Sequence, residues 1–194
     1  MYDVSLFTEL LSNLNITLTD SQIQQFLTYY HMLIERNKVM NLTAITEFED
    51  VIHKHFIDSL SIVKVYQNKE NISVLDMGTG AGFPGIPLKI AFPNWKITLL
   101  DSLNKRVIFL NDVIQQLQLK DIIAIHGRAE EFGKNVTFRE NFDLCVSRAV
   151  AKLSTLSEYC LPYVKIHGYF IPYKAGNIDD EVKDSIKAIE TLGG

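Results

Sequence analysis

Residues 74–88 read VLDMGTGAGFPGIPL, an apolar run that reaches an aspartate and continues into a glycine-rich turn. The chain has ten glycines, and four of them, Gly78, Gly80, Gly82 and Gly85, fall in this stretch. The pattern is typical of a buried strand, a tight turn and the start of a helix, where the backbone approaches a ligand at the carboxyl edge of a parallel sheet. Pro84 suits the first turn of that helix.

The chain around this stretch alternates short apolar segments with longer amphipathic ones. The short segments are ISVLDMG (72–78), WKITLLD (95–101), DIIAIHG (121–127), FDLCVSRA (142–149) and GYFIPYK (168–174). Such alternation predicts an α/β fold, with a mostly parallel sheet flanked by helices, over residues 67–194.

Residues 1–66 predict a helical extension packed on that core. Thr19 and Gln22 fit a capping box at the start of a helix. Two apolar stripes with helical spacing follow. The first is Ile23, Phe26, Leu27, Tyr30, Leu33 and Ile34, and the second is Phe48, Val51, Ile52, His55, Phe56, Leu60 and Val63.

Composition narrows the class of protein further. With 194 residues, 47% of them hydrophobic, the chain is expected to form one main domain. No secretory start, membrane-length apolar run or disulfide framework is visible, and Cys145 and Cys160 form no motif. These features predict a cytoplasmic protein. The net charge of −4 comes without a basic block that would indicate nucleic-acid binding.

The glycine-rich stretch matches two cofactor motifs. Gly80, Gly82 and Gly85 satisfy the dinucleotide pattern G-x-G-x-x-G, whereas Asp76, Gly78, Gly80 and Gly82 satisfy D-x-G-x-G-x-G, which resembles motif I of S-adenosylmethionine-dependent methyltransferases. An aspartate at the strand end is a poor neighbour for a pyrophosphate, but it suits the ammonium group of a methionine moiety. The second pattern is therefore favoured.

A second acid supports a nucleoside-containing cofactor of either kind. Asp101 closes the next apolar segment, where an acid would hydrogen-bond a ribose diol. The alternative for Asp76 and Asp101 is that they cap helices or turns.

Several further segments carry a resemblance to one family. They are MNLTAI (40–45), HFIDSLS (55–61), GAGFPGIPLKI (80–90), LLDSLNKRVIFL (99–110), GRAEEF (127–132) and SRAVAKLSTLSEYCLP (147–162). From about residue 26 to residue 194 the chain resembles the bacterial small-subunit ribosomal RNA guanine-N7 methyltransferases called RsmG or GidB. The resemblance implies a Rossmann-like class I methyltransferase that moves a methyl group from S-adenosylmethionine to N7 of one guanine of 16S ribosomal RNA, in the region that serves decoding.

The resemblance also assigns site residues. The positions that match the family's cofactor contacts are Gly78, Phe83, Ala129, Glu130 and Arg148. Our own interpretation of the motif adds Asp76, Gly80, Gly82 and Asp101. The implied partner is 16S ribosomal RNA or the small subunit, with no metal and no membrane, and the protein is expected to be a monomer.

Arg148 and Lys174 follow adjacent predicted strands and are the candidate catalytic residues. Each would hold the cofactor or the guanine, and the alternative for each is a structural ion pair. No general base is sought, because guanine N7 carries an unprotonated in-plane lone pair at neutral pH. The segment DLCVSRAVA (143–151) shows neither D/N-P-P-Y nor a Pro-Cys nucleophile, and Cys145 is expected to be a buried hydrophobe.

Three polar side chains in the extension have structural alternatives. His53 and His55 are two residues apart and would face different ways on a helix, which disfavours a metal pair. His55 is interpreted as a hydrogen-bonded core residue, although a role in the site stays open. Asn41 fits a helix-end cap better than a contact to the guanine.

The chain departs from the family after AIETLGG (188–194), where family members continue into a final pair of strands and a basic tail. We therefore expect this sequence to lack those strands. Three other functions stay open: an NAD-dependent oxidoreductase, a methyltransferase of a small molecule, and a non-catalytic cofactor-binding or ribosome-associated domain.

Overall fold

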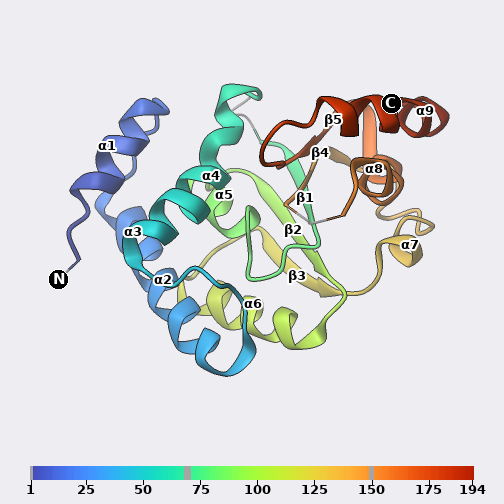
Figure 1. The fold of residues 1–194 in the computed structure, drawn as a ribbon. Helices are drawn as coiled ribbons and strands as arrows, with labels where there is room; N and C mark the ends of the chain where they lie inside the picture. The colour runs from blue at the N-terminus through green and yellow to red at the C-terminus, as the bar shows by residue number, and fades with distance from the viewer. Residues whose placement is uncertain (1, 68–70, 149–150) are drawn as a thin grey trace.

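A computed structural model describes residues 2–67, 71–148 and 151–194 (Figure 1). The N-terminal part is helical and the remainder alternates strands with helices. In chain order the elements are α1 (Ser5–Asn13), α2 (Asp20–Met40), α3 (Phe48–Val51), a π-helix (Ile52–Ile57), α4 (Asp58–Leu60), a 3₁₀ turn (Ser61–Lys64), β1 (Ser73–Met77), α5 (Gly85–Ala91), β2 (Lys96–Asp101), α6 (Asn104–Gln116), β3 (Ile122–His126), α7 (Ala129–Phe132), β4 (Phe142–Ser147), α8 (Leu153–Cys160), a second 3₁₀ turn (Leu161–Tyr163), β5 (Val164–Pro172) and α9 (Asp179–Thr191).

The strands form one parallel sheet in the order β3-β2-β1-β4-β5. All five predicted strands are present, which confirms the α/β fold. The fifth begins at Val164 rather than at residue 168, because Val164 already pairs with Phe142. The register then shifts, so that Tyr169 lies opposite Leu144.

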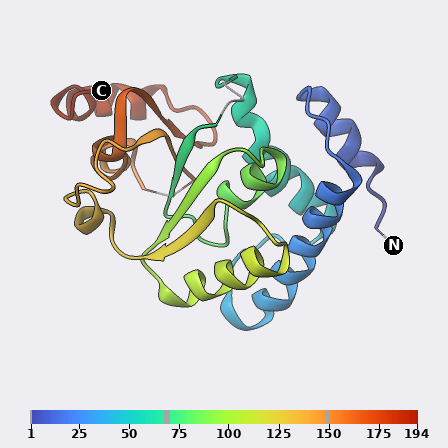
Figure 2. The same ribbon diagram turned by 180° about the vertical axis from the view of Figure 1, so that it is seen from behind.

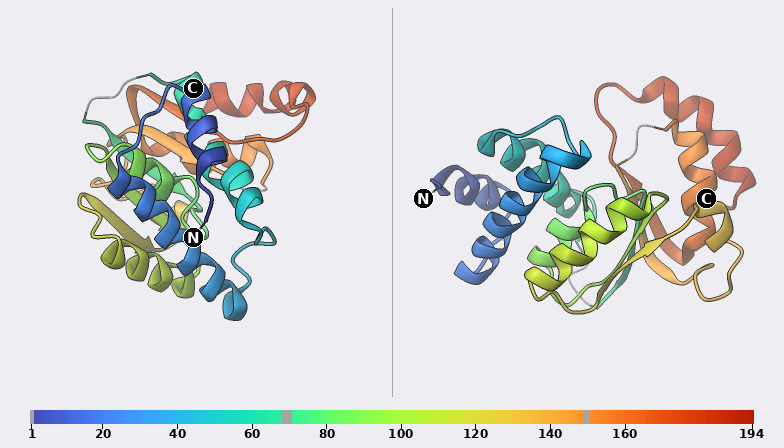
Figure 3. Two further views of the ribbon diagram at one scale, coloured as in Figure 1. Left: turned by 90° about the vertical axis from the view of Figure 1, so that its left-hand side faces the viewer. Right: turned by 90° about the horizontal axis from the view of Figure 1, so that it is seen from below.

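The two faces of the sheet bury different side chains, because successive residues of a strand point to opposite sides. In β1, Val74 packs into a large cluster with the helices from α1 to α6, whereas Leu75 and Met77 pack with Cys145 and Tyr163 on the other face. Figures 1, 2 and 3 show α1, α2 and α6 on one side of the sheet and α8 and α9 on the other. Cys145 is buried in β4, as the sequence predicts.

The N-terminal helices share a core with the sheet. One apolar cluster runs from Phe7 and Phe26 through Phe56 to Leu99 and Leu144. The division of the chain at residues 66 and 67 stays a prediction, because no break in this cluster marks it.

The predicted start of α2 is confirmed. Thr19 Oγ1 accepts from Gln22 N at 3.3 Å, and Gln22 Oε1 accepts from Thr19 N at 2.8 Å. At the other end Asn41 has a left-handed conformation with φ of 48°, so the helix-end role predicted for it is also confirmed. The second apolar stripe is not one α-helix, since it passes through a π-helical segment that contains His55.

Candidate functional site

The carboxyl edge of the sheet has the topology of a ligand site. The chain winds outward from β1 to β3 and then returns to place β4 on the other side of β1. In open α/β sheets, ligands bind at such a switch point, beyond the carboxyl ends of the strands. Among the residues that the structure describes, two cavities lie at this edge, one on each side of the end of β4.

The first, which we call the strand-end cavity, lies over the ends of β1 to β4. It is lined by Met77, Gly78, Leu100, Asp101, Ser102, Gly127, Arg128, Ala129, Glu130, Ser147, Ala151, Leu156 and Tyr159. Four predicted cofactor residues, Gly78, Asp101, Ala129 and Glu130, are therefore brought together here.

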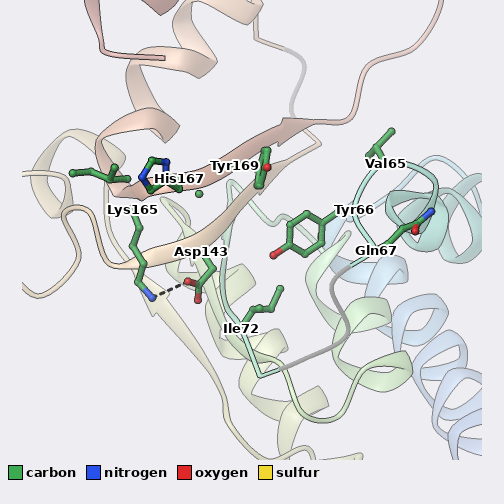
Figure 4. A pocket seen from close by; sticks show the side chains of 10 residues that line it. Val65, Tyr66, Gln67, Ile72, Asp143, Lys165, His167 and Tyr169 are labelled. Atoms are coloured by element: carbon green, nitrogen blue, oxygen red, sulfur yellow. Dashed lines mark hydrogen bonds and ion pairs between the residues drawn. The ribbon is translucent and has the colours of Figure 1, made fainter.

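A larger hollow of about 550 Å³ lies at the opposite edge of the sheet, near the starts of β4 and β5. Figure 4 shows Asp143 and Lys165 paired there beside Tyr66 and Tyr169, and the Lys165 Nζ to Asp143 Oδ1 distance is 2.9 Å. None of the predicted site residues lines it. The larger of these two cavities is therefore not the one that contains the predicted site residues.

The four glycines of the loop divide into two kinds. Gly78 and Gly80 have φ of +69° and +64°, and a Cβ added to Gly78 would meet nothing within 4 Å. Gly82 also has a positive φ, of +108°, but a Cβ added there would lie 2.8 Å from Tyr29 Oη, and one at Gly85 would lie 2.8 Å from Asp76 Oδ2. The first pair allows the turn and leaves room for a ligand, whereas the second pair allows the helix and strand to pack closely.

Asp76 is turned into this loop and is fully buried. Its Oδ2 accepts from Thr79 Oγ1 at 2.7 Å and from Gly85 N at 2.8 Å. Its Oδ1 has no hydrogen-bond partner within the described residues. Burial raises the pKa of Asp76 to about 6, against the opposing effect of the two hydrogen bonds. The carboxylate thus organises the turn, and its predicted contact with an ammonium group stays a prediction.

Asp101 connects the loop to the end of β2. Its Oδ2 accepts from Gly80 N at 2.8 Å and from Arg106 Nη1 at 3.3 Å, while Oδ1 accepts from Leu103 N at 2.8 Å. The carboxylate is 2% exposed, yet it lines the strand-end cavity. It both holds the glycine loop and borders the site.

Pro84, expected in the first turn of α5, is instead the residue before its first helical residue.

The residues around the strand-end cavity fit S-adenosylmethionine. Gly78 leaves open space beside the turn, and Asp101 and Glu130 supply carboxylates for hydroxyl and ammonium groups. Leu100, Leu156 and other apolar side chains supply a surface for a flat base.

Arg148 lies on the other side of the end of β4 and is held from several directions. Its guanidinium carbon is 4.7 Å from the centroid of the Phe83 ring. Its Nη1 donates to Asp58 Oδ2 at 3.0 Å and to Lys54 O at 3.2 Å, and its Nη2 lies 3.1 Å from His55 Nδ1. Phe83 is buried beneath this group, with His55 stacked on its ring at 4.4 Å. Two predicted cofactor residues, Phe83 and Arg148, thus form a cluster with the N-terminal extension.

His55 has polar contacts at both ring nitrogens. Its Nδ1 lies 3.1 Å from Arg148 Nη2, which can only donate, and 3.0 Å from Lys54 O, which can only accept, so these two contacts favour opposite tautomers. Its Nε2 lies 2.8 Å from Thr43 Oγ1. Burial, and secondarily the charge of Arg148, lower the pKa of His55 to about 4. His55 is a buried, hydrogen-bonded residue, as the sequence predicts, and its lowered pKa keeps it neutral at pH 7. It is also a direct partner of a candidate site residue.

Lys174 is held in an ion pair. Its Nζ donates to Glu181 Oε1 at 2.6 Å and to Ala151 O at 2.7 Å, and its side chain is 12% exposed. Lys174 and Arg148 both line the other cavity at the carboxyl edge of the sheet, on the far side of the end of β4 from the strand-end cavity. The ion pair that the sequence left as an alternative for Lys174 is present, and a catalytic role for it stays a prediction.

Sequence reasoning missed two residues of this region. Asp58 was not singled out, although HFIDSLS contains it, and Tyr29 lies outside the predicted stripe of α2. Tyr29 is fully buried, and its hydroxyl donates to Ala81 O in the glycine loop at 2.7 Å. This hydrogen bond could not be predicted from the sequence, because Tyr29 and Ala81 are 52 residues apart in the chain.

The described part of the chain contains neither a candidate metal site nor a helix that could span a membrane. No group of three or more His, Cys, Asp or Glu residues there is placed to hold a metal ion. No helix among the described residues is long and apolar enough to cross a membrane.

The fold and the glycine-loop site together define an S-adenosylmethionine-dependent methyltransferase with the Rossmann-like α/β fold. A solved precorrin-6y C5,15-methyltransferase from Geobacter metallireducens GS-15 shares this fold, with a TM-score of 0.52 at 13% identity over 71% of each chain.

The chain belongs to the rRNA small subunit methyltransferase G family, whose model matches residues 22–194. It is 58% identical over 194 residues to ribosomal RNA small subunit methyltransferase G of Lachnoclostridium phytofermentans. The aligned region covers 100% of this chain and 80% of that protein. The protein of the same name from Desulforamulus reducens is 58% identical over 177 residues, 91% of this chain and 74% of that one. The methyltransferase motif is therefore the one that applies, and the NAD-dependent alternative is set aside.

Proposed function

We propose that this protein transfers the methyl group of S-adenosylmethionine to N7 of a guanine in 16S ribosomal RNA. Membership of the small-subunit methyltransferase G family carries the proposal. The resemblance noted in the sequence supplies the guanine and its N7 atom. A methyltransferase of a small molecule is the remaining rival, and it predicts transfer without RNA.

The chemistry of N7 suits the groups around the site. The lone pair of N7 needs no deprotonation, so the protein has mainly to align it with the methyl donor. His55, the imidazole nearest to Arg148, is not suited to act as a base, because its Nδ1 is occupied and its pKa is lowered to about 4. Methyl transfer to N7 requires no base, so a neutral, weakly basic His55 is compatible with it.

Different residues of the chain would bind the methyl donor and position the acceptor. Gly78, Asp101 and Glu130 would hold S-adenosylmethionine, which supplies an electrophilic methyl group when bound. Arg148 would act at the boundary between donor and acceptor, since Ser147 lines the strand-end cavity and Arg148 lines its neighbour. Attack through N7 leaves a cationic purine, and the pairing of Arg148 with the carboxylate of Asp58 balances the positive charge that Arg148 would otherwise place beside it.

The test is transfer of a tritiated methyl group to small subunits isolated from a strain that lacks this protein. Label recovered as N7-methylguanosine after complete digestion of the RNA is the expected result. Label on small molecules in the absence of RNA would replace the proposal with its rival. A protein that binds the cofactor without transferring the methyl group would be a non-catalytic domain if the N7-methylguanosine content of 16S ribosomal RNA is also unchanged in the strain that lacks it.

We also propose that the protein acts as a monomer in the cytoplasm, where its substrate is assembled. Sedimentation at micromolar concentration should give the mass of one chain.

A further inference from the structure

The second cavity at the carboxyl edge has a volume of about 480 Å³, within the usual range for a small-molecule site. We call it the Arg148 cavity. It is lined by Asp58, Ser61, Ile62, Lys64, Val65, Arg148, Ile171, Pro172, Tyr173, Lys174 and Ala175. Its walls come from the N-terminal extension on one side and from the ends of β4 and β5 on the other.

Asp58 has a free acceptor in this cavity. Its Oδ2 accepts from Arg148 Nη1 at 3.0 Å, and no hydrogen bond to its Oδ1 is present among the residues described. The side chain is 45% exposed, whereas that of Arg148 is 19% exposed. Arg148 therefore fixes the orientation of a carboxylate whose Oδ1 is free in the described part of the chain and whose Oδ2 can accept one further hydrogen bond.

The other groups of the cavity suit a flat base attached to a phosphate chain. Pro172 and the ring of Tyr173 provide an apolar wall, and the hydroxyl of Tyr173 is fixed by donation to Ser59 O at 2.6 Å. Lys64 lies on the wall opposite, near the surface, where an ammonium group can contact a phosphate.

Guanine is the base whose chemistry matches this arrangement. Its Watson–Crick edge presents N1–H and the N2 amino group side by side, and both are donors. A carboxylate, which only accepts, matches two donors, whereas adenine, with an acceptor at N1, does not match it. N7 lies on the opposite edge of the ring system, so a base held by N1 and N2 leaves N7 free.

We propose that the Arg148 cavity receives the acceptor guanine and that Asp58 recognises the N1–H and N2 amino groups of its Watson–Crick edge. This inference rests on the proposed function, and it names the residue that selects guanine. Ser147 and Arg148 are consecutive and line the two cavities, so a base in the Arg148 cavity lies next to the strand-end cavity. The edge of the base that carries N7 then faces away from Asp58.

The variant that tests this is Asp58→Asn. The amide oxygen can still accept from Arg148, but the amide nitrogen presents donors to the donors of guanine. The matched control is Asp50→Asn, because Asp50 is on the same helical segment, is 49% exposed and is paired with Lys54 at 2.8 Å outside the cavity. Both variants and the wild type are assayed on small subunits reassembled with guanosine or with inosine at the nucleotide that the wild type methylates. Inosine lacks the N2 amino group.

Three results are expected. Asp58→Asn lowers kcat/KM for the guanosine substrate about 5- to 150-fold, the range for loss of a bidentate contact to a base, while Asp50→Asn does not. The affinity for S-adenosylhomocysteine stays within about twofold of the wild type for both variants, since the cofactor lies in the other cavity. Inosine lowers kcat/KM about tenfold for the wild type and for Asp50→Asn, but gives no further loss with Asp58→Asn.

An equal inosine penalty in the wild type and in Asp58→Asn would overturn the inference, because the N2 amino group would then be recognised elsewhere. A loss that appears entirely as weaker S-adenosylhomocysteine binding would also overturn it, by showing that Asp58 acts only through Arg148. Both results leave the proposed function intact. Failure of the wild type to form N7-methylguanosine would instead remove the proposed function, and this inference with it.

Discussion

Two buried groups on either side of the glycine loop should respond to acid in opposite directions. Burial holds the pKa of His55 at about 4, below its ordinary value of 6.5, and holds that of Asp76 at about 6, above its ordinary value of 3.8. Both side chains are at most 9% exposed, so solvent screens these effects little. The informative change is Asp76→Asn, which removes one of the two titrations.

The direction of each effect follows from which state binds the proton more tightly. His55 is protonated more readily in the unfolded chain, so its contribution to stability is present above pH 6.5 and is lost as the pH falls towards 4. Asp76 is protonated more readily in the folded protein, so its contribution is present below pH 3.8 and is lost as the pH rises through about 6. Between these limits the two effects oppose each other.

Their magnitudes are similar. Between about pH 7 and about pH 4.5, His55 should lower the free energy of unfolding by about 2 kcal/mol, and Asp76 should raise it by about 2 kcal/mol. The wild type therefore shows little net change from this pair. Asp76→Asn keeps only the His55 contribution and should lose about 2 kcal/mol more than the wild type over the same interval.

The assay is urea unfolding of the cofactor-free protein at both pH values, for the wild type, Asp76→Asn and His55→Gln. Other titrating groups cancel when the pH-dependent change of each variant is compared with that of the wild type. His55→Gln should give a difference of similar size and opposite sign. If Asp76→Asn and the wild type change equally with pH, Asp76 is ionised freely in the folded state and our account of its burial is wrong.

Three further predictions concern the site and its support. The free energy of unfolding should fall by about 1 to 2 kcal/mol in both Gly78→Ala and Gly176→Ala, since both glycines have positive φ and open space around them. Only Gly78→Ala should weaken S-adenosylhomocysteine binding in calorimetry, because of these two glycines only Gly78 lines the strand-end cavity. Arg148→Ala should lower methyl transfer and raise the pKa of His55 from about 4, as followed by NMR; an unchanged His55 titration would contradict the contact between them. Tyr29→Phe should lower the free energy of unfolding by about 1 to 3 kcal/mol because it leaves a buried carbonyl of the glycine loop without its donor, and an unchanged urea midpoint would argue against that bond.

Local patterns in the sequence were sufficient for the strands and for the glycine loop. Strands buried on both faces read as continuous apolar runs, so β1 to β4 could be located within a residue or two. The capping box at Thr19 and the left-handed Asn41 were predictable for the same reason, because both depend on neighbours in the chain. The π-helical segment at Ile52–Ile57 was not, because its apolar spacing resembles that of an ordinary helix.

The sequence by itself therefore determined the α/β class, the family and four of the residues that line the strand-end cavity, Gly78, Asp101, Ala129 and Glu130, since these are carried by contiguous motifs. Only the tertiary structure decided what surrounds Arg148. Its partners Asp58 and His55 lie 90 and 93 residues earlier in the chain, on a helical segment whose apolar stripe predicts burial and says nothing of polar partners. Likewise, the sequence marked Asp76 as an acid beside a glycine turn, but its burial and its hydrogen bonds to Thr79 and Gly85 depend on the packing of α5 against the sheet. Contacts between distant segments are set by the packing of the whole chain, and local periodicity does not contain that information.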